Sequence, residues 1–420
     1  MTKIFFSVGE PSGDIHGANL IAELKRRQPA VDCVGLGGPR MQDAGCELLE
    51  DLTQWAVMWF GRVLLNLHRF LWILSRADRY LRHQRPDAVV LIDYPGFNWW
   101  IARRARVHGI PVFYYGAPQM WGWAGWRIHK MRRLVDHILC KLPFEESWYR
   151  QRGCHATYVG HPFFDEVRRY AMNSTFLTAW KDQPGPLVTI LPGSRTQEIT
   201  QNLPVFLKAA AIISDQLPAV RFAIASFNKR QAQLAQDHVT QSGLDIKIIA
   251  GRSAELMQLA DCCLACSGSV SLELLYHARP TVISYKIHRF GYWLQERFRK
   301  VKYITLVNLL MLENLETDDL SPYHPEAPDA DQVLFPEYLS WQDRSNEIAR
   351  HIVQWLTDHQ KRSQLVARLE SLRDKVGSGG ATARAAQYIL NHLTVKPSKT
   401  RPHYVPKQPN DSTLNRDLAA

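Results

Sequence analysis

The sequence lacks the features that would carry it into or across a membrane. No apolar stretch reaches the ~18 residues of a membrane-spanning helix. The N-terminus, MTKIFFSVGEPSGD, lacks the longer apolar core and the cleavage site of a signal peptide. Cysteine is scarce too, because the 420 residues hold only seven, an odd number spread along the chain. We therefore expect no disulfide scaffold and a reducing compartment.

Acidic residues are also in deficit. Asp and Glu number 40 against 51 Lys and Arg, a formal net charge of +11. This balance suits an anionic partner such as a phosphorylated ligand, an anionic membrane surface or a nucleic acid, without choosing among them. No RNA- or DNA-binding motif is present, so nucleic acid is not an expected partner. Hydrophobic residues at 46% exclude a disordered or fibrous chain.

Motifs for metals and nicotinamide cofactors are missing. Cys263 and Cys266 form a CxxC pair, but no second pair stands at the spacing of a zinc site. Their setting, DCCLACSG, is typical of a buried strand that runs into a turn. Inert core thiols are therefore the favoured interpretation, with metal or redox chemistry as the alternative. No GxGxxG fingerprint occurs at the first strand, and we expect neither a cofactor nor a metal.

Short apolar runs alternate with helix-forming segments, which predicts parallel sheets with helices on both faces. The runs span residues 3–8, 31–35, 88–93, 111–115, 137–142 and 157–160, then 187–191, 221–226, 246–250, 261–266 and 281–285. The pattern restarts after a polar stretch that ends in Pro184-Gly185-Pro186. The fold class is therefore α/β, with two doubly wound Rossmann-like domains facing across a cleft and helices at the C-terminus.

The same pattern suggests domain boundaries. The expected division is a first domain at 1–172, a linker at 173–186, a second domain at 187–344, C-terminal helices at 345–395 that pack back across the domains, and a tail at 396–420. The composition of the tail, KPSKTRPHYVPKQPNDSTLNRDLAA, predicts disorder.

The V-G-E-P-S-G-D segment at residues 8–14 follows the first expected strand and opens a helix. Gly13 permits a tight turn, and Ser12 and Asp14 are residues that cap helices. Carboxyl ends of parallel strands are where ligands bind in such sheets. The segment is therefore either a ligand-facing loop or simply a well-capped turn.

Asp93 ends the apolar run V-V-L-I-D, where an unpaired carboxylate is costly unless it is used. It is placed to take a proton from an attacking hydroxyl, and the alternative is a cap for the helix after Pro95. Gln119 follows the next strand, beside Trp121 and Trp123, in a segment suited to a sugar or acyl ligand or to packing between domains. His161 stands before the linker and either contacts a phosphate or orients the hinge.

Two turns of the second domain have the residues of an anion site. Gly193, Ser194 and Arg195 connect a strand to a helix, where backbone N–H groups and a guanidinium attract phosphate. The small residues Ser267, Gly268 and Ser269 open another helix and are placed to hold a pyrophosphate. Glu273, one turn further, is placed to accept ribose hydroxyls. Each turn alone is an ordinary connection, but two in one domain predict nucleotide binding.

Residues 59–74 form a basic amphipathic pattern of the kind found at membrane surfaces. Arg62 and Arg69 accompany the apolar face, and no acidic residue follows Trp59 before Asp78. Packing against the core is the alternative explanation of such a face. The apolar residues are Trp59, Phe60, Val63, Leu64, Leu67, Phe70, Leu71 and Leu74.

Taken together, the motifs resemble the lipid-A-disaccharide synthase family over residues 3–312 and again over 335–393. They are, in order, GEPSGD, HGANL, GGPRMQDAGC, LIDYPGFN, PQMWGW, LPFE, VGHP, LPGSR, SGSVSLE and YITLVNLL. The resemblance implies a metal-independent inverting glycosyltransferase of GT-B architecture. Such an enzyme joins UDP-2,3-diacylglucosamine to 2,3-diacylglucosamine 1-phosphate, giving a β-1,6 disaccharide and UDP. It implies a peripheral enzyme on the cytoplasmic face of the inner membrane.

The resemblance also implies roles for single residues. Asp93 matches the acidic residue implicated in catalysis, Arg195 and Glu273 match UDP-side positions, and Asn308 lies in the matching Asn-Leu-Leu segment. The helix at 59–74 matches the segment through which the family is thought to meet the membrane. The family's first-domain motifs have the same residue types as this chain at four positions, Glu10, Ser12, Asp14 and Asn98.

The sequence departs from the family's pattern in places and leaves alternatives open. Gly96 stands where the family usually has a second Asp, Pro11 replaces a small residue, Ser340 stands near where a Gln often follows, and the loop 313–332 is longer than usual. The alternatives are another GT-B enzyme, such as a UDP-N-acetylglucosamine 2-epimerase, and a non-catalytic lipid-binding protein. The oligomeric state is open, with a homodimer as one option.

Overall fold

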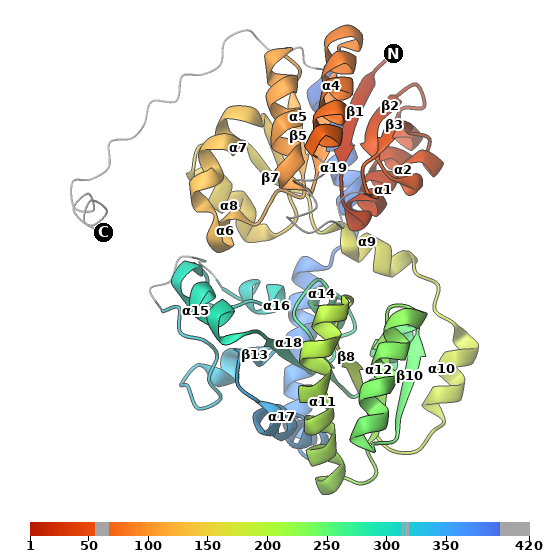
Figure 1. Cartoon of the computed structure of the whole chain (residues 1–420), viewed down its shortest axis with the longest axis vertical. Helices are drawn as coiled ribbons and strands as arrows, with labels where there is room; N and C mark the ends of the chain where they lie inside the picture. The colour runs from red at the N-terminus through yellow and green to blue at the C-terminus, as the bar shows by residue number, and fades with distance from the viewer. Residues whose placement is uncertain (55–66, 313–314, 316–318, 395–420) are drawn as a thin grey trace, which may run out of the picture.

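The computed structural model describes residues 1–54, 67–312, 315 and 319–394. These residues form two parallel sheets, each flanked by helices, and Figure 1 shows them as two units stacked along the long axis. The expected α/β class with two doubly wound units is confirmed. The expected tail at 396–420 lies outside the described residues, as do 313–314 and 316–318 of the loop at 313–332.

The first sheet has the strand order β3-β2-β1-β4-β5-β6-β7. Its strands are β1 (Lys3–Val8), β2 (Asp32–Gly37), β3 (Glu47–Asp51), β4 (Ala88–Ile92), β5 (Val112–Tyr115), β6 (His137–Cys140) and β7 (Ala156–Tyr158). Its helices are α1 (Pro11–Arg27), α2 (Pro39–Asp43), α4 (Leu67–Gln84), α5 (Pro95–Val107), α6 (Met120–Trp123), η1 (Gly125–Arg127), α7 (Ile128–Leu134), α8 (Pro143–Gln151) and α9 (Pro162–Arg169). Every residue of β4 is buried, as expected of a central strand covered on both faces.

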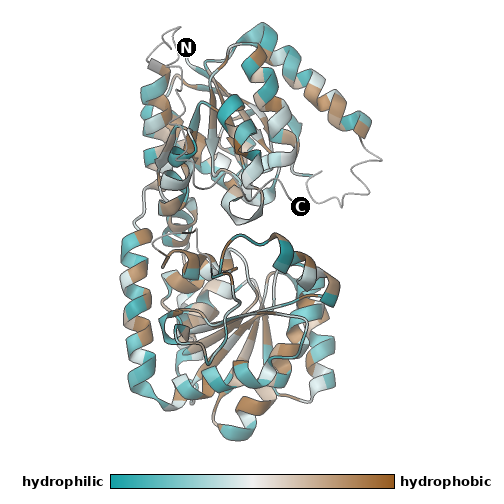
Figure 2. Ribbon diagram, turned by 90° about the vertical axis from the view of Figure 1, so that its left-hand side faces the viewer, coloured by the Kyte–Doolittle hydropathy of each residue, from teal (hydrophilic) through white to brown (hydrophobic). Residues whose placement is uncertain are grey.

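The second sheet has the order β10-β9-β8-β11-β12-β13. Its strands are β8 (Leu187–Leu191), β9 (Arg221–Ser226), β10 (Ile246–Ala250), β11 (Cys262–Ala265), β12 (Thr281–Lys286) and β13 (Glu337–Ser340). Around it lie α10 (Ser174–Lys181), α11 (Thr196–Gln216), α12 (Lys229–Ser242), α13 (Ser253–Leu259), α14 (Val270–Tyr276), α15 (Arg289–Phe298), α16 (Leu306–Leu309), η2 (Ala330–Gln332), α17 (Ser345–Thr357) and α18 (His359–Val376). In Figure 2 the strands of this sheet are mostly brown, whereas the surrounding helices alternate between brown and teal.

The two units are joined by more than the chain connection. Helix α19 (Ala381–Thr394) packs against α1 and α9 of the first unit, so the chain returns there after the second sheet. Val301 and Tyr303, which follow α15, are buried in the same apolar cluster as Tyr114 and Trp121 of the first unit. The ends of parallel strands from both units therefore face one another across packed side chains.

The segment between the sheets is more ordered than its polar composition suggests. Residues 173–186 contain helix α10, capped by the Asn173 side chain, which accepts a hydrogen bond from the Phe176 N–H at 2.8 Å. The buried carboxylate of Glu255 accepts a bond from the Asn173 N–H at 3.1 Å and another from the Tyr170 hydroxyl at 3.3 Å. These hydrogen bonds to Glu255 hold the start of this segment against the second unit.

The CxxC pair lies at β11 and immediately after it. Both Cys263 and Cys266 are buried free thiols, and burial raises the pKa of each to about 12. Within the described ranges no group of three or more His, Cys, Asp or Glu side chains is placed to hold a metal ion. A thiol with such a pKa stays protonated and unreactive near neutral pH, which favours the interpretation as inert core residues.

Candidate active site

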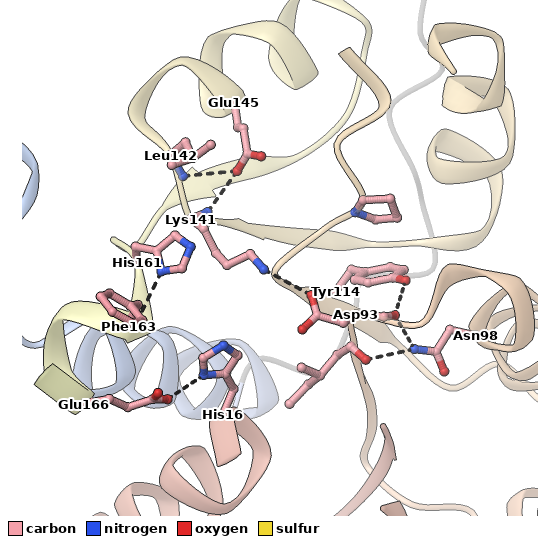
Figure 3. Close-up of polar contacts among 12 residues, drawn as sticks. His16, Asp93, Asn98, Tyr114, Lys141, Leu142, Glu145, His161, Phe163 and Glu166 are labelled. Atoms are coloured by element: carbon pink, nitrogen blue, oxygen red, sulfur yellow. Dashed lines mark hydrogen bonds and ion pairs between the residues drawn. The ribbon is translucent and has the colours of Figure 1, made fainter. Parts of the chain in front are cut away.

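The carboxyl edge of the first sheet is organised around Asp93, which directly follows β4. The φ angles of Asp93 and Tyr94 are +46° and +42°, a left-handed conformation that is strained for residues with side chains. Asn98 Nδ2 donates to the Asp93 carbonyl at 2.8 Å, and the Tyr114 hydroxyl donates to the same oxygen at 2.7 Å. These two bonds hold the strained turn and direct the Asp93 carboxylate away from the sheet (Figure 3).

The Asp93 carboxylate is paired with a lysine that the sequence analysis missed. Lys141 Nζ lies 3.0 Å from Asp93 Oδ1, and Figure 3 shows the two side chains pointing at one another. Burial opposes the charge of Lys141, but Asp93, helped by Glu145 and Glu10, more than offsets it and raises the pKa of Lys141. Gly116 makes room for the pair, since a Cβ there would lie 2.9 Å from Lys141 Cε and Nζ.

A narrow hollow, too small to enclose a water molecule, opens beside this pair. It is lined by His16, Ile92, Asp93, Tyr115, Gly116, Lys141 and Pro162. Glu10 is exposed near it, and partial desolvation together with the Asp93 charge raises the pKa of Glu10. Two carboxylates and one ammonium therefore share one strand edge, an arrangement suited to proton transfer.

Two first-domain residues expected at the substrate are used within the protein instead. The buried Asp14 carboxylate accepts bonds from the N–H groups of Gly38 at 2.9 Å, Arg40 at 3.1 Å and Met41 at 3.2 Å, so it caps α2. Asn98 is fully buried and holds the Asp93 turn. In this structure both side chains position backbone groups, and their expected role at the substrate stays a prediction.

The other first-domain residues that were expected at the substrate differ in how exposed they are. Ser12 is exposed at the start of α1, whereas Gly13 is buried and a Cβ there would approach Val8 Cγ1 to 2.9 Å. Gln119 is exposed at the start of α6. His161 Nδ1 accepts the Phe163 N–H at 3.3 Å and caps α9, and burial lowers the pKa of this imidazole. Of the two interpretations of His161, the geometry favours orientation of the hinge.

The first anion turn of the second unit already has an acceptor. Glu198 Oε2 accepts bonds from the N–H groups of Ser194 at 2.8 Å and Arg195 at 3.1 Å. The φ of Gly193 is +122°, and a Cβ there would lie 2.5 Å from Glu198 Cβ. The two N–H groups are thus not open to phosphate in this arrangement. The Arg195 side chain is 82% exposed, and its Nη1 lies 3.5 Å from Glu198 Oε1, so Glu198 pairs with the guanidinium as well.

The second turn presents small residues and an unpaired carboxylate. Gly268 and Ser269 are exposed, with Ser267 half-buried behind them. Glu273 is half-buried, and its carboxylate makes no hydrogen bond or ion pair with any residue in the described part of the chain. Burial, with the nearby Glu255 charge, raises the pKa of Glu273 to about 7. A half-buried carboxylate without a partner costs free energy unless a ligand hydroxyl donates a hydrogen bond to it.

Asn308 is buried rather than ligand-facing. Its Nδ2 donates to the Phe335 carbonyl at 2.8 Å and to Glu337 Oε2 at 3.0 Å. Glu337 also accepts the N–H groups of Ile304 and Thr305, and burial raises the pKa of Glu337 to about 7. The Asn308 side chain therefore joins α16 to β13, and its expected contact with substrate stays a prediction.

Only part of the expected membrane helix is described. Trp59, Phe60, Val63 and Leu64 lie outside the described residues. At the start of α4, Leu67 is 52%, Leu71 57% and Trp72 52% exposed. Phe70 is corrected, because it packs against Phe97, with 6.1 Å between ring centroids, and belongs to the core side. No helix in the described ranges has both the length and the apolar character needed to cross a bilayer.

Comparison with known proteins decides the family. The family model described as lipid-A-disaccharide synthetase matches residues 4–369. The chain belongs to the lipid-A-disaccharide synthase family. Curated lipid-A-disaccharide synthases include one from Syntrophus aciditrophicus, 32% identical over 92% of this chain and 97% of that protein. Another, from Geobacter sulfurreducens, is 33% identical over 93% of this chain and 97% of that protein.

Solved structures support the fold of this synthase. A putative UDP-N-acetylglucosamine 2-epimerase from Listeria monocytogenes matches with a TM-score of 0.61 at 11% identity, over 93% of this chain and 96% of that one. The glycotransferase of kitacinnamycin matches at 0.56 and 14% identity, over 93% and 99%. At such low identity these likenesses concern architecture, so the 2-epimerase alternative gains nothing from them. The chain is a glycosyltransferase of lipid A biosynthesis, as the family match and the curated relatives show.

Proposed function

We propose that this synthase transfers 2,3-diacylglucosamine from its UDP donor to 2,3-diacylglucosamine 1-phosphate, with Asp93 as the general base. The observation that carries the role of Asp93 is its geometry: a carboxylate held in a strained turn at the strand edge, beside a hollow and 3.0 Å from Lys141. Strain of this kind persists only where the surroundings fix it, and it concentrates at functional sites.

In the proposed step Asp93 takes the proton of the acceptor's 6-hydroxyl as that oxygen attacks the anomeric carbon of the donor. The new bond joins the oxygen to the anomeric carbon, the bond from that carbon to the diphosphate breaks, and UDP leaves with the electron pair. The Lys141 ammonium stays beside the Asp93 carboxylate, with its Nζ 3.0 Å from Oδ1. In-line attack inverts the donor and gives the β linkage.

For the nucleotide, we assign the Arg195 guanidinium to the diphosphate and the Glu273 carboxylate to the ribose hydroxyls. The turn at Ser267, Gly268 and Ser269 supplies small residues that let the diphosphate approach the backbone. Gly193 and Ser194 join this site only if Glu198 moves from the N–H groups that it now occupies. Arg195 and the turn, not a metal ion, would then offset the charge that develops on UDP.

Both assignments are tested by binding UDP alone. Arg195→Ala and Glu273→Gln should each weaken UDP binding by ~1–3 kcal/mol, because each removes a charge-assisted contact. Arg230→Ala is the matched control, an exposed arginine at the start of α12 in the same unit. Calorimetry measures all three. If both test variants bind like the parent, the nucleotide site lies elsewhere.

The acyl specificity is tested by comparing donors. With the acylated acceptor present, the purified chain should release UDP from UDP-2,3-diacylglucosamine and release little from UDP-glucosamine without acyl chains. Equal release from both donors would favour a soluble transferase over the proposed substrate.

We propose that the enzyme is peripheral on the cytoplasmic face of the inner membrane and meets lipid through residues 59–74. The support in the described part is the exposed apolar start of α4, where Leu67, Leu71 and Trp72 are more than half exposed. Burying exposed apolar side chains in an interface stabilises binding by ~25 cal/mol per Å².

This contact has a matched pair of variants on one helix. Replacing Leu67, Leu71 and Trp72 with Ser should leave the melting temperature nearly unchanged and reduce sedimentation with anionic vesicles. Ile73→Ala, on the buried side of the same helix, should instead cost ~2–5 kcal/mol of unfolding free energy. A collapse of stability in the triple variant would mean that this face belongs to the core.

A further inference from the structure

Helix α15 of the second unit has no buried residue, although its sequence, RFGYWLQERF, is rich in apolar side chains. Phe290 is 73%, Trp293 58% and Phe298 59% exposed, and Leu294 is 42% exposed. Spacings of three and four residues put these side chains on one face of the helix. The Phe290 and Trp293 rings stack with centroids 5.9 Å apart. A contiguous apolar face of this size on a soluble unit marks a contact surface.

The first unit continues this face. The Lys300 N–H, just after α15, donates to the Gly122 carbonyl of α6 at 3.1 Å, so the two elements meet; Figure 1 shows α15 opposite α6. Next to Gly122, Trp123 is 59% and Trp126 64% exposed. The Arg127 guanidinium lies 4.9 Å and 5.1 Å from the centroids of these two rings. The aromatic rim is defined here by six residues: Trp123, Trp126, Phe290, Trp293, Leu294 and Phe298.

The charge around the aromatic rim is strongly positive. Residues 121–133 and 289–302 together contain nine Lys and Arg but a single acidic residue, Glu296. Several of the cations have local partners. Lys302 pairs with Asp319 and Asp329, and Arg299 donates to the Leu320 carbonyl. The Arg289 guanidinium lies over the Trp341 ring, and Arg132 contacts His129. Arg297 and Lys300 are exposed and have no side-chain partner within the described ranges. A surface of tryptophan, phenylalanine and free cations is complementary to anionic lipid headgroups over acyl chains.

The geometry points to the aromatic rim as a second membrane contact, separate from residues 59–74, that binds an anionic phospholipid surface. It rests on the proposed function in one respect: the acylated substrates reside in such a membrane. A second copy of the chain is disfavoured, because a symmetric contact would bring the nine cations of each copy together. Nucleic acid is disfavoured because Leu294 and Phe298 add apolar area that phosphate contacts do not use.

A consequence of this placement is that the membrane would orient both units of the protein. Because the rim takes residues from α6 and η1 of the first unit and from α15 of the second, a flat lipid surface would touch both units where they meet. Binding there would hold the junction between the two sheets at the membrane, whereas the start of α4 alone would anchor only the first unit.

The test is sedimentation of the full chain with vesicles of phosphatidylcholine alone or with 30% phosphatidylglycerol. The test variant carries Phe290→Ser, Trp293→Ser and Phe298→Ser. The control carries Val107→Ser and Phe227→Ser, two side chains that are 64% and 70% exposed elsewhere. We expect the test variant to partition into anionic vesicles ~10-fold less than the parent, the control to match the parent, and both to keep the parent's melting temperature. Arg297→Gln with Lys300→Gln should weaken binding to anionic vesicles only.

Unchanged partitioning of the test variant would overturn the proposal. The proposal would also be overturned if the test variant formed a smaller oligomer in light scattering. The same holds if it lost binding to single-stranded RNA while it still bound vesicles. UDP release from detergent-dispersed acylated substrates is measured in parallel. It should be the same for parent and test variant, so a failure of the proposed reaction would appear there and a failure of the membrane contact only in the vesicles.

Discussion

Asp93→Asn is expected to lower turnover by ~10²–10⁴-fold, because the amide keeps the shape of the carboxylate but cannot take a proton. UDP binding should stay near that of the parent, since Arg195 and Glu273, which we propose to bind the nucleotide, lie on the other unit. Some stability should be lost as well, because the variant leaves the Lys141 ammonium without its counter-charge, although the bonds from Asn98 and Tyr114 to the residue 93 main-chain carbonyl are unaltered. Single-turnover kinetics with both acylated substrates measure the effect.

The matched control is Asp43→Asn, an exposed carboxylate of α2 in the same unit. It should leave turnover unchanged. Near-normal turnover in Asp93→Asn, or an equal loss in Asp43→Asn, would remove Asp93 from the role of base.

The second large effect is expected for Lys141→Met, which removes the cation beside Asp93. Removing Lys141 deletes a charge that lowers the pKa of Glu10 and leaves the Asp93 charge that raises it, so a proton should bind this group of residues at higher pH. The acid limb of kcat against pH should therefore move up by ~1 unit, with a further loss of turnover at its plateau. Glu145, Glu10, His16 and His161 also face this lysine, and the profile reports the group as a whole.

The same variant changes stability with pH in a defined direction. The pKa of Lys141 is raised in the folded chain, so the pair stabilises the fold fully below the unfolded pKa of lysine and loses this effect as pH rises above it. The parent should thus lose more stability than Lys141→Met between pH 10 and 12. Lys130→Met, an exposed lysine of α7, serves as the control and should shift neither curve. An unmoved acid limb in Lys141→Met would contradict the role given to the pair.

The sequence revealed the central strands because burial on both faces leaves an unbroken apolar run, as in β4. It did not reveal β3 and β13, whose sequences are ELLED and EYLS. Both are edge strands, with one neighbour instead of two, and their polar residues erase the apolar signal. Lys141 ends an apolar strand as Asp93 does, and the same signal would have found it.

The roles of polar motif residues were less predictable. Asp14 and Asn98 lie in motifs that look ligand-facing, yet their partners are backbone groups brought close only by the fold. Glu198 likewise accepts the N–H groups of Ser194 and Arg195, a contact that its position three residues after the N-cap of α11 could have indicated. Helix α15 has a pattern that is equally typical of a core helix, and only the absence of a neighbour on its apolar face in the described chain shows otherwise.

The most direct test of the central claim is the ratio of UDP released to disaccharide formed by the purified chain with both acylated substrates. The account predicts one UDP for each β-1,6 disaccharide, no release without the acceptor, and the loss of both products together in Asp93→Asn. UDP released in the absence of acceptor, or a donor epimerised with no disaccharide formed, would contradict it.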